Sequence, residues 1–180
     1  PRQLCIDRME FAADGSIRKI TPTHDGVGIL APAVVKSTNL AFGKSVRASS
    51  SYDDNFRPEY AVDDNNGTLW RPRGMGQEWI EIDLGRSQPI QTIWTQFEYG
   101  TQFYQYLIET STDGKHWNIF ADKRNNHLAG SPMVDFGKAK ARYVRLTYTG
   151  GQMNGFGGAI WNIKVFSGIE ASAPQQWLGL

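Results

Sequence analysis

Residues 60–70 carry the sequence YAVDDNNGTLW, in which Asp63, Asp64, Asn65, Asn66 and Thr68 crowd oxygen atoms into one short segment. Such a loop suits Ca²⁺, which takes about six to eight oxygen ligands and tolerates irregular geometry. It does not suit zinc, which prefers His and Cys. The segment therefore predicts a calcium loop that stabilises a binding domain rather than a catalytic centre.

Length and composition limit what the rest of the chain can be. The chain has 180 residues, of which 40% are hydrophobic and 21% charged, and its formal net charge is +1. These values are ordinary for a soluble globular protein with one domain and an appendage. The densest basic run, residues 138–142, has no interleaved aromatic residue, so nucleic acid is not an expected partner. No apolar run approaches the roughly 20 residues of a membrane-spanning helix.

The ends of the chain and its cysteine content say little about compartment. Cys5 is the single cysteine, so no intrachain disulfide can form. The first residue is Pro1, and no apolar signal segment follows it. We therefore expect a processed or excised piece of a longer chain.

The pattern after about residue 38 is typical of an all-β sandwich. Short alternating segments are separated by Gly, Asp, Asn and Pro, and long helical periodicity is absent. Predicted strands cover residues 79–84, 93–97, 106–111, 143–147 and 163–166. A turn over residues 112–115 should close the third of these. Ile80, Ile82 and Leu84 share one face, as expected where a sheet buries one side.

The first 37 or so residues have a different character. Residues 4–11 read as a strand, Ala13-Asp14-Gly15 as a hairpin turn and residues 17–20 as the return strand. A two-stranded hairpin is marginal by itself in water, so this one should lean on another body. We place a boundary near Ser37.

Several motifs together resemble coagulation factor 5/8 type C (discoidin) domains. The matching residues are Asn39-Leu40-Ala41, Gly43-Lys44, Ala48-Ser49-Ser50, Ala61-Val62-Asp63 with Thr68 and Trp70, Trp79 to Gly85, Glu109 to Trp117, and Ala141 to Leu146. They occur in this order over residues 38–168. The resemblance implies a galactose-binding-like jelly-roll β-sandwich, the fold of carbohydrate-binding modules of family 32.

The preceding residues resemble the closing strands of five-bladed propeller glycoside hydrolases of family 43. The matching residues are Cys5 to Phe11, Asp14 to Ile17, and Pro22-Thr23. Those enzymes include β-xylosidases and α-arabinofuranosidases, often followed by sugar-binding modules. The resemblance implies that residues 1–37 are the end of a catalytic propeller and its linker, residues 38–168 a binding module and residues 169–180 a tail.

The resemblance also implies a set of metal ligands. They are the carbonyl of Tyr60, the side chains of Asp63, Asn65 and Thr68, the carbonyl of Trp161 and the side chain of Asn162. Asn162 supplies a neutral amide where related modules carry a carboxylate, which should weaken calcium binding. The alternative is an Asx-rich turn whose side chains cap their own backbone.

A sugar site needs an aromatic face and a few placed polar groups. By family position, such groups would come from three loops, residues 51–58, 99–104 and 151–158. The candidates are Tyr99, Phe103, Asn154 and Phe156, together with Arg71 or Arg73 from the loop after Trp70. In the alternative, Phe103 and Phe156 fold inward as loop anchors. The His and Arg typical of galactose-binding relatives are not clearly placed, so a preference for galactose is not implied.

We expect structural roles for three of the tryptophans. Trp70 and Trp117 fall where the family packs its core, whereas Trp94 lies on the outward face of its strand. Trp94 is expected to contact the N-terminal hairpin or the missing propeller, or simply to be half-exposed.

No catalytic residues are expected in this chain. Its three histidines are scattered, at His24, His116 and His127. Hydrolysis of a glycosidic bond needs two carboxylates across a pocket. The adjacent pairs at residues 53–54 and 63–64 should point apart, and Glu81 with Asp83 should be solvated or structural.

The sequence therefore predicts a non-catalytic carbohydrate-binding module of a larger glycoside hydrolase, resembling a β-xylosidase or α-arabinofuranosidase. Its partners would be an oligo- or polysaccharide and the missing catalytic domain, in a secreted, periplasmic or cell-surface protein. Two alternatives remain. The domain could only stabilise the propeller, or it could adhere to proteins or membranes, although its loops lack an aliphatic spike.

Overall fold

A computed structural model describes residues 12–19, 38–153 and 157–168 of the chain. The chain divides into two units, Pro1–Lys36 and Ser37–Leu180. In the first unit the predicted hairpin turn is present, because Gly15 has φ +83° and its N–H donates to the Ala12 carbonyl at 2.9 Å. The strand expected over residues 4–11 lies outside the described residues.

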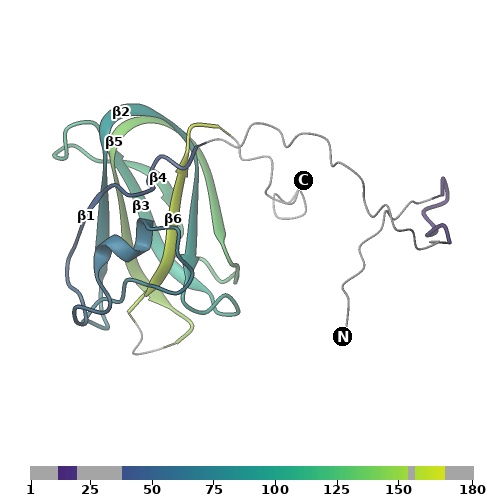
Figure 1. The fold of residues 1–180 in the computed structure, drawn as a ribbon, viewed down its shortest axis with the longest axis horizontal. Helices are drawn as coiled ribbons and strands as arrows, with labels where there is room; N and C mark the ends of the chain where they lie inside the picture. The colour runs from purple at the N-terminus through teal and green to yellow at the C-terminus, as the bar shows by residue number, and fades with distance from the viewer. Residues whose placement is uncertain (1–11, 20–37, 154–156, 169–180) are drawn as a thin grey trace, which may run out of the picture. The chain divides into compact units, whose positions relative to one another are not determined.

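In the second unit the described residues form six strands and one short 3₁₀ helix (Figure 1). They are β1 (Ser45–Ala48), η1 (Pro58–Val62), β2 (Glu78–Phe97), β3 (Tyr104–Ser111), β4 (Asn118–Asp122), β5 (Met133–Gly151) and β6 (Ile160–Phe166). All strand pairs are antiparallel. The predicted all-β class is confirmed. No described helix has the length and apolar character needed to cross a membrane.

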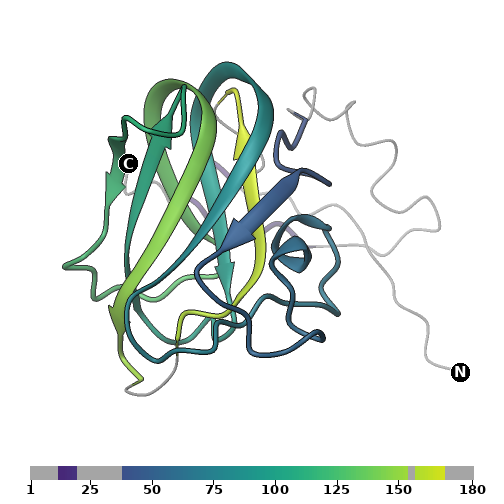
Figure 2. The ribbon, with the colours of Figure 1, turned by 90° about the vertical axis from the view of Figure 1, so that its left-hand side faces the viewer.

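Two long strands, β2 and β5, bend and contribute to both layers of the sandwich. Residues 80–83 of β2 pair with β1, and residues 78–83 pair with residues 143–148 of β5. Strands β3 and β4 extend this first layer. Residues 88–95 of β2 pair with residues 133–141 of β5, and the end of β2 also pairs with β6. Figures 1 and 2 show both strands arching over at one end of the domain.

The bend in β2 has a local cause. The pairing of β2 with β5 shifts register between Asp83 and Gln88, and Gly85 within this interval has φ +85°. A side chain at that φ would be strained, so glycine allows the turn. The strands expected at residues 79–84 and 93–97 are therefore the two halves of one bent strand.

The core lies between the two layers. Ile80, Ile82 and Leu84 are at most 1% exposed, which confirms their shared inward face. Trp70 is also buried, and its indole N–H donates to the Ser50 carbonyl at 3.0 Å. Buried aromatic and aliphatic side chains supply most of the stabilisation of such a sandwich.

Trp94 and Trp117 both lie outside this core. Trp94 is half-buried, which matches the last of its stated alternatives, and its ring lies 5.4 Å from that of Phe166. The expectation that Trp117 lies in the core is wrong. Trp117 is half-buried on the outer face of the first layer, where the Arg145 guanidinium stacks 3.9 Å from its ring centroid.

A charged group is buried at the edge of the core. Asp135 is 2% exposed, and its Oδ2 accepts a hydrogen bond from the hydroxyl of the fully buried Tyr106 at 2.8 Å. The Lys123 ammonium lies 3.6 Å from Oδ1. Burial raises the pKa of Asp135 above its ordinary value, and Tyr106 and Lys123 oppose this shift only in part.

This raised pKa predicts a pH dependence of stability. The Asp135 contribution is complete below the unfolded-state pKa of about 4 and is lost as the pH rises through the higher folded-state pKa. Asp135→Asn removes the titration. Between about pH 3 and pH 7, the free energy of unfolding of the wild type should therefore fall relative to that of the variant. Urea denaturation at a series of pH values measures this difference, and parallel curves would contradict the assignment.

Candidate functional site

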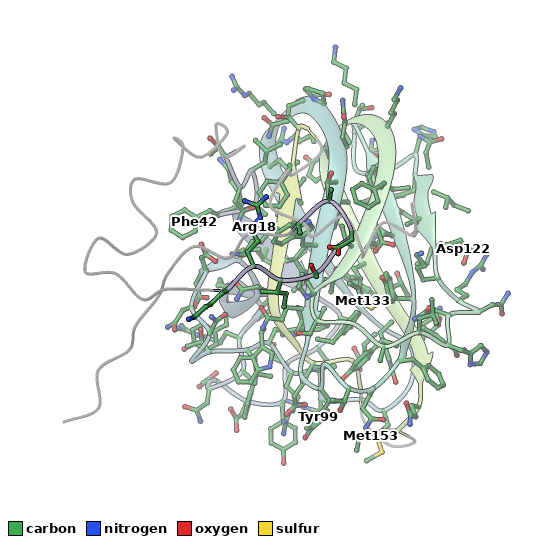
Figure 3. The ribbon with its side chains drawn as sticks, turned by 90° about the vertical axis from the view of Figure 1, so that its right-hand side faces the viewer. Arg18, Phe42, Tyr99, Asp122, Met133 and Met153 are labelled. Carbon is green, nitrogen blue, oxygen red and sulfur yellow. The ribbon has the colours of Figure 1, made fainter. Side chains whose placement is uncertain are left out.

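Several loops gather at the end of the sandwich opposite the bends in β2 and β5. Backbone hydrogen bonds connect them: the Tyr52 N–H donates to the Arg71 carbonyl at 2.8 Å, and the Glu98 N–H donates to the Ala159 carbonyl at 2.9 Å. Figure 3 shows Tyr99 and Met153 projecting at this end. Loops on a rigid scaffold are common positions for binding groups.

The central feature of this loop end is an ion pair between Arg71 and Glu98. The Arg71 guanidinium also lies 4.9 Å from the ring centroid of Phe56, a cation–π distance. The backbone carbonyl of Glu98 accepts the indole N–H of Trp161 at 3.2 Å. Arg71 is thus fixed in orientation, while a third of its side chain stays exposed.

A hollow of about 140 Å³ lies beside this pair. Its lining residues are Tyr52, Arg71, Pro72, Arg73, Gly74, Met75, Glu98 and Gly157. Tyr52 is 55% exposed and Met75 is 72% exposed. The hollow is smaller than the roughly 300 Å³ and more that enclose a drug-sized ligand. It therefore suits a ligand held by one end or one edge.

A buried carboxylate holds the loops that form the hollow. Glu78 is 8% exposed, and its Oε1 accepts the Gly74 N–H at 3.0 Å. Its Oε2 accepts the hydroxyls of Ser49 and Ser50. Ser50 Oγ in turn accepts the Arg73 N–H at 2.9 Å. Sequence reasoning missed Glu78, because a Glu before a strand carries no signal that its partners are distant loops.

Close backbone approach explains a second feature that sequence reasoning did not identify. A Cβ built on Gly157 would lie 2.3 Å from the Gly74 carbonyl oxygen, far inside contact distance. Only glycine lets the segment before β6 approach the loop that carries Arg73. This packing joins the late part of the domain to the hollow.

The other predicted sugar-binding residues fall in different places. Tyr99 and Phe103 line a neighbouring hollow of about 10 Å³, room for about one water molecule. Phe103 is half-buried and packs edge-on against His127, as in the anchor alternative. Burial raises the pKa of Tyr104 to about 12, and its hydroxyl accepts the Tyr99 N–H at 3.0 Å. Asn154 and Phe156 lie outside the described residues.

The predicted calcium loop does approach β6. Trp70 and Ile160 exchange backbone hydrogen bonds of 2.9 Å in both directions, and the Asn162 amide lies 3.2 Å from Asn66 Oδ1. Tyr60 lies in η1 and Trp161 on β6, so the two groups of predicted ligands come from adjoining segments.

Hydrogen bonds within the loop already use much of the oxygen set. Asp63 accepts the Asn65 N–H at 2.9 Å and the Thr68 hydroxyl at 2.7 Å. Asn65 Oδ1 accepts the Gly67 N–H at 2.9 Å, an Asx turn. These contacts match the alternative in which the loop caps its own backbone.

Charge also limits how well this loop fits calcium. The Lys164 ammonium pairs with the neighbouring Asp64, and Asn162 is neutral, so Asp63 is the one carboxylate among the predicted ligands. No cluster of three or more His, Cys, Asp or Glu side chains occurs among the described residues. The oxygen chemistry fits Ca²⁺ in part, and weak binding through Asp63, Asn65 and Thr68 stays a prediction.

Two of the candidate carboxylates, Glu81 and Asp83, lie in ion pairs with arginines. Glu81 is 3% exposed and is held between Arg47 and Arg145, and Asp83 is held by Arg142. His116 pairs with Asp113 in an exposed turn. Each of these groups has a structural role, as expected for Glu81 and Asp83.

Comparison with known proteins gives one family match. The F5/8 type C domain matches residues 45–162. HylA of Enterococcus faecalis (strain ATCC 700802 / V583), a polysaccharide lyase 8 family protein, is 31% identical over 94 residues. That alignment covers 50% of this chain and 7% of HylA, so the chain spans a small part of this curated relative.

Solved structures with the same fold include two modules of a chitosanase/glucanase from Paenibacillus sp. IK-5. Chitosan-binding module 1 is 26% identical with a TM-score of 0.64, covering 72% of this chain and 98% of the module. Chitosan-binding module 2, solved in complex with chitotriose, is 27% identical with a TM-score of 0.62, covering 71% of this chain and 99% of the module. The predicted jelly-roll fold is confirmed.

The calcium prediction can be tested by thermal unfolding. If calcium binds the folded loop, the melting temperature of the wild type should rise on adding calcium, since a ligand at 100 times its Kd stabilises by about 2.7 kcal/mol. Asp63→Ala should abolish this rise, whereas Asp54→Ala, which alters an exposed acid of a neighbouring loop, should retain it. A wild-type melting temperature that is equal in calcium and in chelator would rule the site out.

The role of Glu78 predicts a loss of stability. Glu78→Gln replaces one acceptor oxygen by an NH₂ group, which then faces a hydroxyl or N–H donor of its partners in a buried site. The substitution should lower the free energy of unfolding by about 1–3 kcal/mol. Glu59→Gln, at an exposed position in η1, is the matched control and should change it by less than about 0.5 kcal/mol. Equal stability of the two variants in urea denaturation would show that the loops do not depend on this carboxylate.

Proposed function

Because this chain belongs to the F5/8 type C domain family, we propose that residues 38–168 form a non-catalytic carbohydrate-binding module of a larger polysaccharide-degrading enzyme. The observation that carries the proposal is the fixed Arg71–Glu98 pair beside the exposed ring of Tyr52. The module would bind its sugar without altering it.

The chemistry of the hollow suits a pyranose. The apolar side of a sugar ring can lie on Tyr52, while its hydroxyls reach the outward N–H groups of Arg71 and the remaining oxygen of Glu98. Phe56 and Glu98 fix the guanidinium before the sugar arrives, so little conformational freedom is lost on binding. Arg71 and Arg73 are thus the predicted residues that the proposal retains, and Tyr52 is added to them.

Known relatives support saccharide as the ligand class. The two Paenibacillus modules are named for binding chitosan, and one was solved with chitotriose. The Glu98 carboxylate would accept a hydrogen bond from an amino group or a hydroxyl of such a sugar. We propose an oligo- or polysaccharide ligand that is bound at a chain end or edge, because the hollow encloses only about 140 Å³.

The module's role would be targeting. A weak sugar contact raises the effective concentration of an attached catalytic domain at its polysaccharide. HylA, which matches this chain over part of its length, is a polysaccharide lyase 8 family protein. We propose that the parent is likewise an enzyme acting on polysaccharide, resembling a family 43 glycoside hydrolase at residues 1–37. Such a protein would be secreted, periplasmic or on the cell surface, where polysaccharide is found.

Substitution of Tyr52 tests the proposal. Tyr52→Ala removes the stacking surface and should weaken binding of chitotriose, or of the best ligand on a glycan array, at least about tenfold in calorimetric titration. Phe42→Ala removes an equally exposed ring outside the hollow and should leave the affinity unchanged. Arg71→Gln should weaken binding by a similar factor.

Two results would overturn the proposal. One is the absence of binding to a broad panel of neutral, amino and acidic glycans by the wild-type chain. The other is equal affinity of Tyr52→Ala and Phe42→Ala, which would place the sugar elsewhere.

A further inference from the structure

A groove of about 410 Å³ crosses the outer face of the first layer, toward the end where β2 and β5 bend. β1, β2, β5 and the β3–β4 turn line it, and its lining includes Ser45, Arg47, Glu81, Asp113, Lys115 and Tyr143. None of these residues lines the hollow beside Arg71. The groove falls within the range of about 300–1,000 Å³ that is usual for ligand sites.

A charged row of three side chains crosses these strands, and two of its members, Arg47 and Glu81, line the groove. Arg47, Glu81 and Arg145 are opposite one another on β1, β2 and β5. Glu81 accepts Arg47 Nε at 2.7 Å on one oxygen and Arg145 Nη2 at 2.7 Å on the other. Arg145 is further fixed between the rings of Trp79 and Trp117, 5.4 and 3.9 Å from their centroids. The buried carboxylate therefore holds both arginines in place.

One wall of the groove is the tight turn after β3. Asp113 accepts the backbone N–H groups of Lys115 and His116 at 2.8 and 2.9 Å, and Gly114 has φ +73°. A Cβ on Gly114 would lie 3.5 Å from the ring of Tyr143, so the turn packs on that ring. These contacts keep Lys115 at the groove edge.

Among the described residues of the groove, the acceptor groups already have hydrogen-bond partners, whereas several donor groups do not. Each carboxylate oxygen lining it already accepts a hydrogen bond or an ion pair: those of Glu81 from two arginines, those of Asp83 from Arg142, and those of Asp113 from its own turn. The groups left without a partner among the described residues are the Lys115 ammonium and the hydroxyls of Ser45 and Tyr143. Arg47 uses only its Nε and Nη2 groups on Glu81.

We propose that this groove is a second carbohydrate site, which takes a sugar residue bearing a negatively charged group, either a carboxylate or a sulfate. The groove offers cationic donors that have hydrogen bonds to spare, whereas its carboxylate oxygens are already bonded. Such a site favours a ligand that is rich in acceptors and carries negative charge. Lys115 and Arg47 would contact the anionic group, and the Arg fork suits its planar or tripodal oxygens. Ser45 and Tyr143 would bind neighbouring hydroxyls. This site does not depend on the loop-end hollow.

The test is a two-dimensional ¹⁵N NMR titration of the full chain at fixed ionic strength. The probes are trigalacturonate, galactose 6-sulfate and neutral xylotriose. The variants are Lys115→Gln, its matched control Lys138→Gln, which alters an exposed lysine outside the groove, and Tyr52→Ala, which disables the loop-end hollow. Amides of Val46 and Gly114 report on the groove, and those of Arg73 and Gly74 report on the hollow.

At least one acidic probe should shift the groove amides, and xylotriose should not. Lys115→Gln should weaken this binding about tenfold, whereas Lys138→Gln and Tyr52→Ala should leave it unchanged. Whichever acidic probe binds identifies the anionic group. The proposal is overturned if neither acidic probe shifts the groove amides, if all shifts occur at the hollow, or if Lys115→Gln and Lys138→Gln bind equally.

Discussion

The carboxylate of Glu78 is buried where β2 begins, and it accepts hydrogen bonds from Ser49, Ser50 and the Gly74 backbone. These partners belong to two loops that are distant in sequence from each other. A buried charge is costly unless its oxygens are fully bonded, so the loops cannot separate without leaving it unsatisfied. Ser50 also accepts the Arg73 N–H, so Glu78 helps to hold the loop that carries Arg73 next to the loop that carries Tyr52, and both loops line the hollow.

The strand arrangement explains why binding groups collect at this end. Strands β2 and β5 each start at this end, bend at the other end and run back to it. Several loops therefore leave the sandwich side by side (Figure 2). The Arg71–Glu98 pair joins one of these loops to the end of β2. A rigid scaffold of this kind holds a guanidinium and a carboxylate in position before any sugar arrives. In the proposed function, a module of modest affinity keeps an attached enzyme near its polymer.

The sequence was sufficient for the fold class but not for the site. Alternation identified the buried face of Ile80, Ile82 and Leu84, because burial on one side of a strand leaves a period of two. Trp117 was misplaced, since its position after a turn does not show that an arginine of β5 stacks on it. Glu78 was missed because its partners lie in other loops, and such distant pairing has no sequence period. The same limit applies to the outer groove, because its residues come together only through the register of β1, β2 and β5.

In the proposed function, the hollow between Tyr52 and the Arg71–Glu98 pair receives a sugar while Glu78 keeps its loops in place. A crystal structure of the chain with a bound oligosaccharide tests it most directly. We expect a pyranose ring against Tyr52, with hydroxyls on Arg71 or Glu98 and the Glu78 hydrogen bonds intact. A ring seated away from these residues, or a Glu78 side chain turned out to solvent, would contradict the account.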